Sequence, residues 1–200
     1  MFTGIVQDVG QVVSRETRGG DVRLLIAFDR LHPSGINVGD SICVQGCCLT
    51  AVEIRDRTFA ADVSRETLSL TTLGGLEAGS PVNLEPSLKA GDPLGGHLVS
   101  GHVDGVGEIT SMSGDARSTR VEVSVPAALA RYIAKKGSVT LEGVSLTVNE
   151  VRGATFGVNL IPHTQAVTTL GTLRTGARVN VEVDQIARYV ERLLNDSAQR

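Results

Sequence analysis

Short apolar runs, interrupted by polar residues and bounded by Gly or Asp, recur through the first half of the chain and predict β-strands. The runs are rich in β-branched residues, which are enriched in strands. The expected strands are residues 21–29, 41–46, 49–54, 58–63 and 81–85. Many short strands with few helices indicate a small antiparallel barrel.

Four segments carry helical features instead. Residues 126–137 have Pro126 at a first turn and end on Lys-Lys-Gly, while residues 64–74 and 162–171 each end on a glycine. The tail, residues 184–200, has an apolar stripe at helical spacing. The stripe consists of Ile186, Tyr189, Val190, Leu193 and Leu194. Either its own barrel or another subunit must cover this stripe, and the pattern favours neither.

The sequence is internally duplicated. VQGCCLTAVEI at residues 44–54 has a near-copy, LEGVSLTVNEV, at residues 141–151, a shift of 97 residues. The same shift aligns residues 2–85 with 99–182 without a gap, and about 25 of those 84 positions are identical. This period is too long for a solenoid, so it indicates two related domains joined by the Pro- and Gly-containing connector 86–97.

Composition excludes several classes of protein. The chain is 41% hydrophobic and 20% charged with a net charge of -3, which makes nucleic acid an unexpected partner. No run approaches the 18 consecutive apolar residues of a membrane span, and the first ten residues lack signal-peptide features. Three cysteines crowded at positions 43, 47 and 48 favour reduced thiols, so we expect a cytoplasmic protein.

Three motifs give the chain a family resemblance: MFTGIV at the N-terminus, GGHLVSGHVDG at 95–105, and the paired GCCLT and GVSLT. Together they resemble the riboflavin synthases of the alpha-chain type, over residues 1 to about 195. The resemblance implies an all-β chain of two tandem homologous Greek-key antiparallel β-barrels, residues 1–97 and 98–184, followed by a C-terminal α-helix, residues 185–200, for oligomerisation. It implies no organic cofactor and no metal.

The same resemblance implies a transferase reaction. Two molecules of 6,7-dimethyl-8-ribityllumazine exchange a four-carbon unit and give riboflavin and 5-amino-6-(D-ribitylamino)uracil, the last step of riboflavin biosynthesis. Each active site holds two substrate molecules and lies between subunits of a homotrimer, and an association with lumazine synthase is possible. The duplication fits this reaction, because a substrate that is held twice calls for a binding module that occurs twice.

The resemblance also implies which residues bind substrate. In the first half they are Gly4, Ile5, Val6, Cys48, Leu49, Thr50, Asp62, Val63, Ser64, Arg65, Glu66 and Thr67. In the second half they are Gly101, His102, Val103, Lys136, Ser145, Leu146, Thr147, Asn159, Leu160, Ile161, Pro162, His163 and Thr164. Repeated glycines would let the backbone approach a flat ring, and repeated threonines would offer hydroxyl groups to it.

Several positions related by the repeat carry different side chains in the two halves, as expected if the two substrate molecules play different roles in the reaction. One substrate loses a proton from its 7-methyl group and the other accepts a nucleophile at C7. The differing pairs are Ile5 and His102, Gly39 and Lys136, Cys48 and Ser145, and Glu66 and His163. Histidine and cysteine are groups that exchange protons or add near neutral pH.

Several roles stay open for these side chains. His102 is the first candidate for proton transfer, although a lone histidine is more often structural. Cys48 is either a small packed side chain or a nucleophile. Ser145 and Thr147 could activate water or bind the ring, and Lys136 could stabilise a lumazine anion. His97 is interpreted as a structural residue of the connector, and His97 with His102 makes no convincing zinc pattern.

One rival reading comes from a different class of protein. Lumazine-carrying optical antenna proteins resemble the same family, bind ligand without catalysis and use only one functional pocket. A degraded second pocket would favour that reading, but the candidate residues of the second half are all present.

Overall fold

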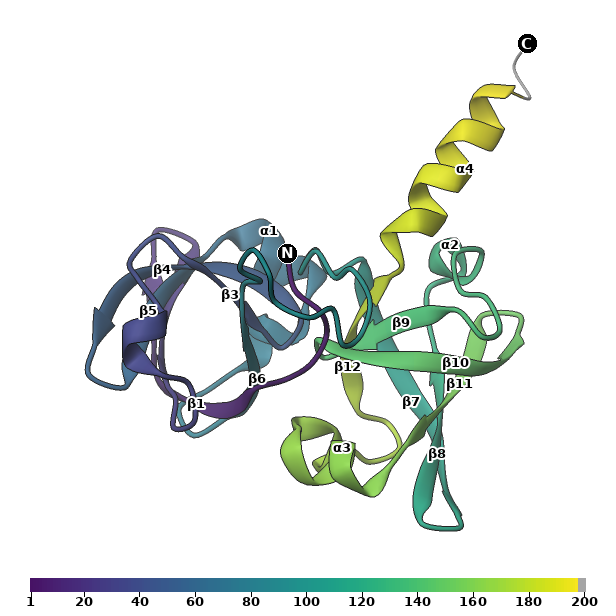
Figure 1. The fold of residues 1–200 in the computed structure, drawn as a ribbon, viewed down its shortest axis with the longest axis horizontal. Coiled ribbons are helices and arrows are strands. Elements are labelled where there is room, and N and C mark those ends of the chain that lie inside the picture. Colours follow the sequence, from purple (N-terminus) through teal and green to yellow (C-terminus); the bar gives the residue numbers. More distant parts are fainter. Residues whose placement is uncertain (198–200) are drawn as a thin grey trace.

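Two closed β-barrels, each of six antiparallel strands, form most of the molecule (Figure 1). The computed structural model describes residues 1–197. The first barrel closes in the order β1-β2-β5-β4-β3-β6, which contains a Greek key. Its strands are β1 (Asp8–Arg18), β2 (Asp21–Ala27), β3 (Ser41–Val44), β4 (Cys47–Arg55), β5 (Thr58–Val63) and β6 (Pro81–Pro86). The predicted fold class is confirmed.

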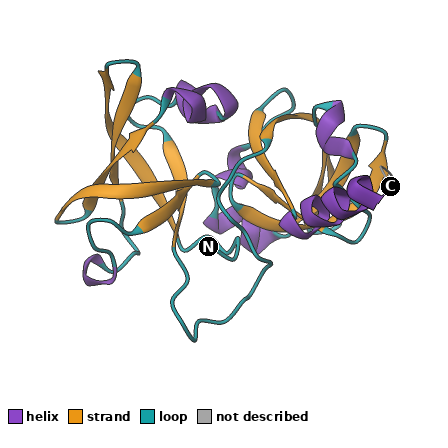
Figure 2. Ribbon diagram, turned by 90° about the horizontal axis from the view of Figure 1, so that it is seen from above, coloured by secondary structure: helices purple, strands orange, loops and turns teal. Residues whose placement is uncertain are grey.

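The second barrel repeats the first in topology and in detail. Its strands are β7 (Gly105–Asp115), β8 (Ser118–Ser124), β9 (Ser138–Leu141), β10 (Val144–Arg152), β11 (Thr155–Leu160) and β12 (Arg178–Val183). The strand order is cyclically the same. Even the register shifts recur, because those after Val12 and Ala51 have partners 97 residues later, after Ile109 and Val148. Figure 2 shows the two barrels side by side.

The five predicted strands of the first half are all present, but the first strand of each barrel was missed. Strand β1 alternates buried and exposed positions only as far as Val12, and every residue from Val13 to Arg18 is exposed. The outer part of β1 is held by pairing with β2 and not by burial, so its charged sequence carries no strand pattern.

The short helices follow the strands β5 and β11. Helix α1 (Arg65–Leu70) leads into the 3₁₀ turn η2 (Thr72–Gly75), and α3 (Pro162–Val167) leads into η3 (Thr169–Thr172). Each α-helix ends a few residues earlier than predicted. The cause is a threonine: Thr71 Oγ1 donates to Thr67 O (2.7 Å) and accepts from Leu73 N (3.2 Å), which closes one helix and starts the next turn. One further turn, η1 (Pro33–Gly35), precedes β3.

The helix predicted over 126–137 is wrong in length, because only α2 (Ala127–Ala130) forms. Beyond it, Ile133 is buried in the barrel core, and Lys136 N donates to Val148 O of β10 (2.8 Å). Lys136 has a φ of +68°, which no right-handed helix contains. Contacts with the barrel therefore override the local helical preference.

A symmetric polar network joins the barrels. Asn83 of β6 donates from Nδ2 to Glu142 O (2.9 Å) and accepts at Oδ1 from Thr169 N (2.8 Å). Its repeat partner Asn180 makes the matching two bonds to the first barrel, at 2.8 and 2.7 Å. The duplication therefore extends to the interface, which has an approximate two-fold axis.

Glu142 breaks the symmetry of this network. Its repeat partner is Gln45, whose Oε1 accepts from Asn83 N (2.7 Å), and Glu142 Oε1 accepts from Asn180 N (2.6 Å) in the same way. Glu142 is buried, and its Oε2 has no partner within the described residues. Burial raises the pKa of Glu142 to about 8, and the hydrogen bond from Asn180 opposes that shift only in part.

We expect Glu142→Gln to stabilise the protein at neutral pH. A carboxyl group whose pKa is raised by folding stabilises most when it is protonated, so its contribution is complete below about pH 4.5 and is lost as pH rises towards 8. The variant should therefore match the parent near pH 4.5 and exceed it by about 3 kcal/mol at pH 7. Urea unfolding at several pH values measures this, with the exposed Glu108→Gln as control. A gain that does not vary with pH would contradict the argument.

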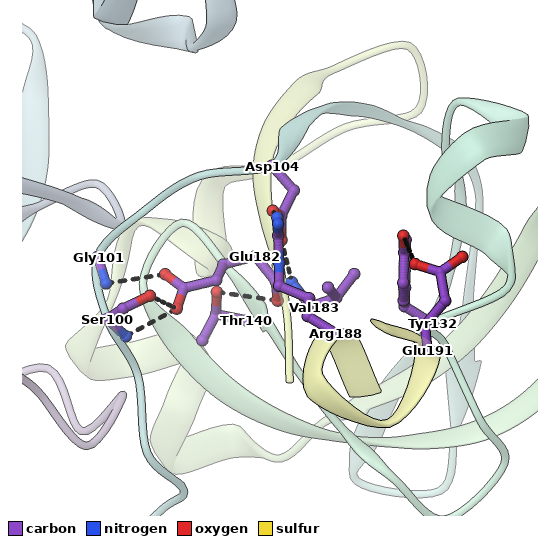
Figure 3. A network of polar contacts seen from close by, with 9 residues as sticks. All are labelled: Ser100, Gly101, Asp104, Tyr132, Thr140, Glu182, Val183, Arg188 and Glu191. Carbon is purple, nitrogen blue, oxygen red and sulfur yellow. Dashed lines mark hydrogen bonds and ion pairs between the residues drawn. The ribbon is translucent and has the colours of Figure 1, made fainter. Parts of the chain in front are cut away.

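Helix α4 (Gln185–Ser197) projects away from both barrels (Figure 1). Its polar face is tied to the second barrel, because Arg188 pairs with Asp104 and Glu191 accepts from the Tyr132 hydroxyl (Figure 3). Glu191 also pairs with Arg131 (2.7 Å). The opposite, apolar stripe is 49–70% exposed at each of its five residues. The chain's own barrel therefore does not cover the stripe. Residues 198–200 of the predicted tail lie outside the described residues.

Within the described part of the chain, none of the helices combines the length and the apolar character needed to cross a membrane.

Candidate functional site

Two short segments, residues 1–6 and 98–103, cross between the barrels, and we call them the crossing segments. They pair with each other at their starts, where Phe2 N donates to Val99 O (2.8 Å) and Val99 N donates to Phe2 O (3.0 Å). A buried carboxylate then holds each of them: Glu182 accepts from the backbone of Ser100 and Gly101 at 2.7 and 2.9 Å (Figure 3). Glu85 does the same for the first segment.

Each crossing segment serves the barrel of the other half. Val103 packs against the core of the first barrel, and Val6 packs against the core of the second. The candidate residues of these two segments therefore lie against the barrel of the other half of the sequence. Every site draws on both halves of the chain.

The Cys48 site lies on the first barrel beneath the second crossing segment. Cys48 N donates to Gly101 O (2.8 Å), which fixes the segment over strand β4. A cavity of about 210 Å³ opens here. Its lining residues are Cys47, Cys48, Glu66, Thr67, Leu70, Thr71, Gly101, His102 and Val103.

The Ser145 site is the equivalent place on the second barrel. Ser145 N donates to Gly4 O of the first crossing segment (2.8 Å), which repeats the bond between Cys48 and Gly101. Ser145 and Thr147 lie on β10, Asn159 lies on β11 and Thr164 lies in α3. These positions mirror those around Cys48, as the duplication predicts.

Some candidate residues can offer only their backbone to a ligand. The side chains of Leu49, Val63, Leu146 and Leu160 are buried in the barrel cores. Next to Leu49 on β4 and Leu146 on β10, Thr50 and Thr147 are exposed. The alternation follows from strand geometry, which turns successive side chains to opposite faces.

The two sites differ in charge. Asp62 of the first barrel is held by Arg23, with Nε and Nη2 each 2.7 Å from a carboxylate oxygen, and this contact lowers the pKa of Asp62. The related residue in the second barrel is the neutral Asn159, which donates to Asp115 (3.1 Å) and whose Oδ1 has no partner within the described residues. Glu66 also faces the Cys48 site, while the second barrel has His163 at that position. The two sites therefore differ in their charged groups: the first has the Asp62–Arg23 ion pair and Glu66, and the second has Asp115 beside Asn159.

The three thiols fall into two classes. Cys43 and Cys47 are buried, and burial raises the pKa of each thiol, which makes them packed side chains as expected. Cys48 is half-buried and lines the cavity. Cys47 also borders the cavity, but it is almost fully buried, so Cys48 is the more accessible of the two thiols.

Lys136 stands in a costly backbone conformation. Its φ is +68°, whereas its repeat partner in the first barrel is a glycine, Gly39, at φ +95°. A side chain in this left-handed region costs roughly 1 kcal/mol. Such strain is concentrated at functional sites. The lysine is exposed just before β9, and its N donates to Val148 O in the middle of β10, next to Thr147.

His102 and His97 lie at different sites. His102 is exposed and lines the Cys48 cavity, although it belongs to the second half of the sequence. His97 was interpreted as a connector residue, yet its Nδ1 lies 2.7 Å from Ser145 Oγ. The sequence offered one indication of this contact: His97 shortly precedes the candidate residues at 101–103.

No group of three or more His, Cys, Asp or Glu side chains in residues 1–197 is arranged to hold a metal ion. The sites instead offer exposed backbone, hydroxyl groups, a thiol, an imidazole and an ammonium group. Together they define a duplicated-barrel protein with two related candidate sites for a small molecule.

Comparison with known proteins agrees with this class. The lumazine binding domain matches the chain twice, at residues 3–87 and 100–184. The chain is 45% identical over 201 residues to a riboflavin synthase of Mycobacterium bovis, covering 98% of this chain and all of the relative. It is 42% identical to that of Photobacterium phosphoreum, covering 97% of this chain and 89% of the relative. The chain belongs to the lumazine-binding, duplicated-barrel family of the riboflavin synthases.

Solved structures share the fold as well. LumP complexed with riboflavin superimposes with a TM-score of 0.85 at 29% identity, covering 92% of this chain and all of LumP. LumP complexed with 6,7-dimethyl-8-(1'-D-ribityl) lumazine gives a TM-score of 0.82 at 28% identity, covering 92% of this chain and 99% of LumP.

Proposed function

We propose that the chain is a riboflavin synthase, which converts two molecules of 6,7-dimethyl-8-ribityllumazine into riboflavin and 5-amino-6-(D-ribitylamino)uracil. The observation that carries this proposal is the pairing of two sites with the same scaffold and different reactive side chains. A protein that only binds lumazine needs a single pocket, or two identical pockets. A dismutation, in which one substrate gives carbons and the other receives them, needs two pockets that differ.

The roles proposed for individual residues follow their positions. At the Cys48 site, His102 moves a proton and Cys48 is the adding nucleophile or shapes the ring pocket. At the Ser145 site, Ser145 and Thr147 bind the ring or a water molecule, and Lys136 balances the negative charge of a deprotonated lumazine. Holding the two rings face to face supplies most of the rate enhancement, since orientation alone can contribute about 7 to 11 kcal/mol.

The two substrates of one reaction must come together although the Cys48 and Ser145 sites lie on separate barrels. We propose that the site of one subunit faces the other kind of site on a neighbouring subunit, within a homotrimer held by α4. The exposed apolar stripe of α4 supports this arrangement, because an uncovered stripe of this kind is typical of an interface.

The test is a turnover assay with the purified chain and 6,7-dimethyl-8-ribityllumazine, followed by riboflavin fluorescence. We expect one riboflavin for every two substrate molecules consumed, without added metal or cofactor. Conversion that requires an added cofactor, or no conversion at all, would reject the proposal.

The second candidate is a lumazine-binding protein without catalysis, which the likeness to LumP favours. Calorimetry with a non-reacting ribityllumazine analogue separates the two candidates. We expect two equivalents per chain, because the same contact between crossing segment and strand occurs on both barrels, from Cys48 N to Gly101 O and from Ser145 N to Gly4 O. One equivalent per chain together with no turnover would instead support the carrier.

A further inference from the structure

The crossing segment that carries His102 lies between two cavities. On one side is the Cys48 cavity, and on the other a cavity of about 590 Å³ opens between the segment and the first turns of helix α4. His102 is exposed and lines both cavities. The position of its imidazole therefore depends on the backbone that carries it.

Asp104 directly follows this crossing segment and fixes its end by three contacts. Its N donates to Val181 O of β12 (2.8 Å), and its Oδ2 accepts from Val183 N (2.7 Å). Its Oδ1 pairs with Arg188 of α4 (Figure 3). The side chain of Asp104 is only 1% exposed, whereas that of Arg188 is 51% exposed. The helix therefore supplies the positive charge that a buried carboxylate requires.

The other end of the same stretch is anchored as well, because Glu182 Oε2 accepts from Gly101 N (2.9 Å) (Figure 3). Only His102 and Val103 lie between Gly101 and Asp104. A displacement of either anchor must therefore move the histidine.

The pair of Asp104 and Arg188 has no equivalent in the first half of the chain. A shift of 97 residues relates Asp104 to Gln7, which is exposed, and Arg188 to Gly91, which has no side chain. Of the two crossing segments, the one with the candidate histidine is therefore the one that helix α4 anchors.

We propose that Asp104 and Arg188 are positioning residues for His102: the pair fixes the crossing segment to helix α4 and so sets where the imidazole stands in the Cys48 site. Neither residue of the pair lines the Cys48 cavity, so both act through the segment. Because α4 also carries the exposed apolar stripe, the pair ties the histidine to the helix that would meet a neighbouring subunit. For the reaction, this inference rests on the proposed function.

Kinetics of two variants of Arg188 test the proposal. Arg188→Met removes the charge that faces Asp104, and we expect kcat to fall about 10-fold while KM changes less than about 2-fold. The reason is that a proton-transferring group is misplaced while the contacts of the ring with the barrels remain. Arg188→Lys keeps a positive charge and should recover most of the rate. Light scattering should give the parent's mass for both variants, since the apolar stripe is unchanged.

Arg131→Met is the matched control on the same helix. It removes the ion pair between Arg131 and Glu191 of α4, which does not involve the crossing segment. Its kcat should equal that of the parent. A loss equal to that of Arg188→Met would show that any loosening of α4 lowers the rate, and would overturn the specific role of the pair.

A double variant keeps the test valid if Arg188→Met does not fold. A buried carboxylate that loses its partner destabilises a protein, and Asp104→Asn combined with Arg188→Met leaves no such charge. Since both changes break one contact, the double variant should lose no more rate than Asp104→Asn alone. Losses that multiply would show that the two residues act independently and would overturn the proposal.

Nuclear magnetic resonance of protein with ¹³C-labelled histidine follows His102 without any turnover. We expect its ring resonance, identified by its absence from His102→Gln, to shift in Arg188→Met and to stay in place in Arg131→Met. An unshifted resonance in Arg188→Met would overturn the proposal, as would a kcat equal to that of the parent. If the parent makes no riboflavin, the proposed function fails, but the resonance still decides whether the pair positions His102.

Discussion

Gly101→Ala is expected to empty the Cys48 site and to lower the rate of riboflavin formation more than about 100-fold, because displacing a binding group by about 1 Å can cost that much. Gly101 has a φ of +77°, and a Cβ there would lie 2.7 Å from Cys48 Cβ and 2.9 Å from Cys48 N. Both contacts are with Cys48, one with its backbone and one with its short side chain, and neither group can move aside. The crossing segment must lift, taking His102 and Val103 out of the cavity.

Calorimetry and the fluorescence assay measure the two effects separately. Ligand stoichiometry should fall from two per chain to one, since the Ser145 site lies beneath the other crossing segment. Gly4→Ala is the matched variant at that site, where a Cβ would lie 2.6 Å from Ser145 Cβ. Gly114→Ala, in open space at a strand end, is the control and should leave both values unchanged. Two equivalents bound by Gly101→Ala would show that the crossing segment does not form the site.

The fold was predictable because the repeat constrains every element twice. A shift of 97 residues aligns strands, turns and even the bulges after Val12 and Ile109, so a pattern that is weak in one half is supported by the other. The sequence-based prediction failed where tertiary contacts, and not the hydrophobic pattern, determine the local structure. The outer part of β1 is held by pairing alone, and the segment after Ala130 is held by Ile133 and Lys136.

The composition of each site was not predictable from the repeat. Alignment of the halves relates Gly4 to Gly101 and Cys48 to Ser145, but the structure pairs Cys48 with Gly101 and Ser145 with Gly4. With an approximate two-fold axis, each crossing segment can contact either its own barrel or the other barrel. The two arrangements make equivalent contacts, so the repeat alone does not distinguish them. His97 was missed because it lies in the connector, outside the aligned residues 2–85 and 99–182.

Val190→Glu in α4 is expected to weaken assembly and to make activity depend on protein concentration. Val190 is half-exposed, and the described part of its own chain leaves the whole stripe uncovered. If subunits meet through this stripe, a carboxylate must be desolvated there without a partner, which costs several kcal/mol. The dissociation constant for assembly should rise at least about 100-fold.

Light scattering and activity measured over the same dilution series test this expectation. Specific activity of Val190→Glu should rise with concentration over a range in which the parent stays constant, because a working pair of sites requires two subunits. Asn195→Glu adds the same charge at an exposed position outside the stripe, on the face that carries Arg188 and Glu191, and should behave like the parent. The folds of both barrels should survive, since the polar face of α4 still holds Asp104 through Arg188. A Val190→Glu protein that is monomeric and keeps full activity at every dilution would place both substrates within one chain and would refute the shared site.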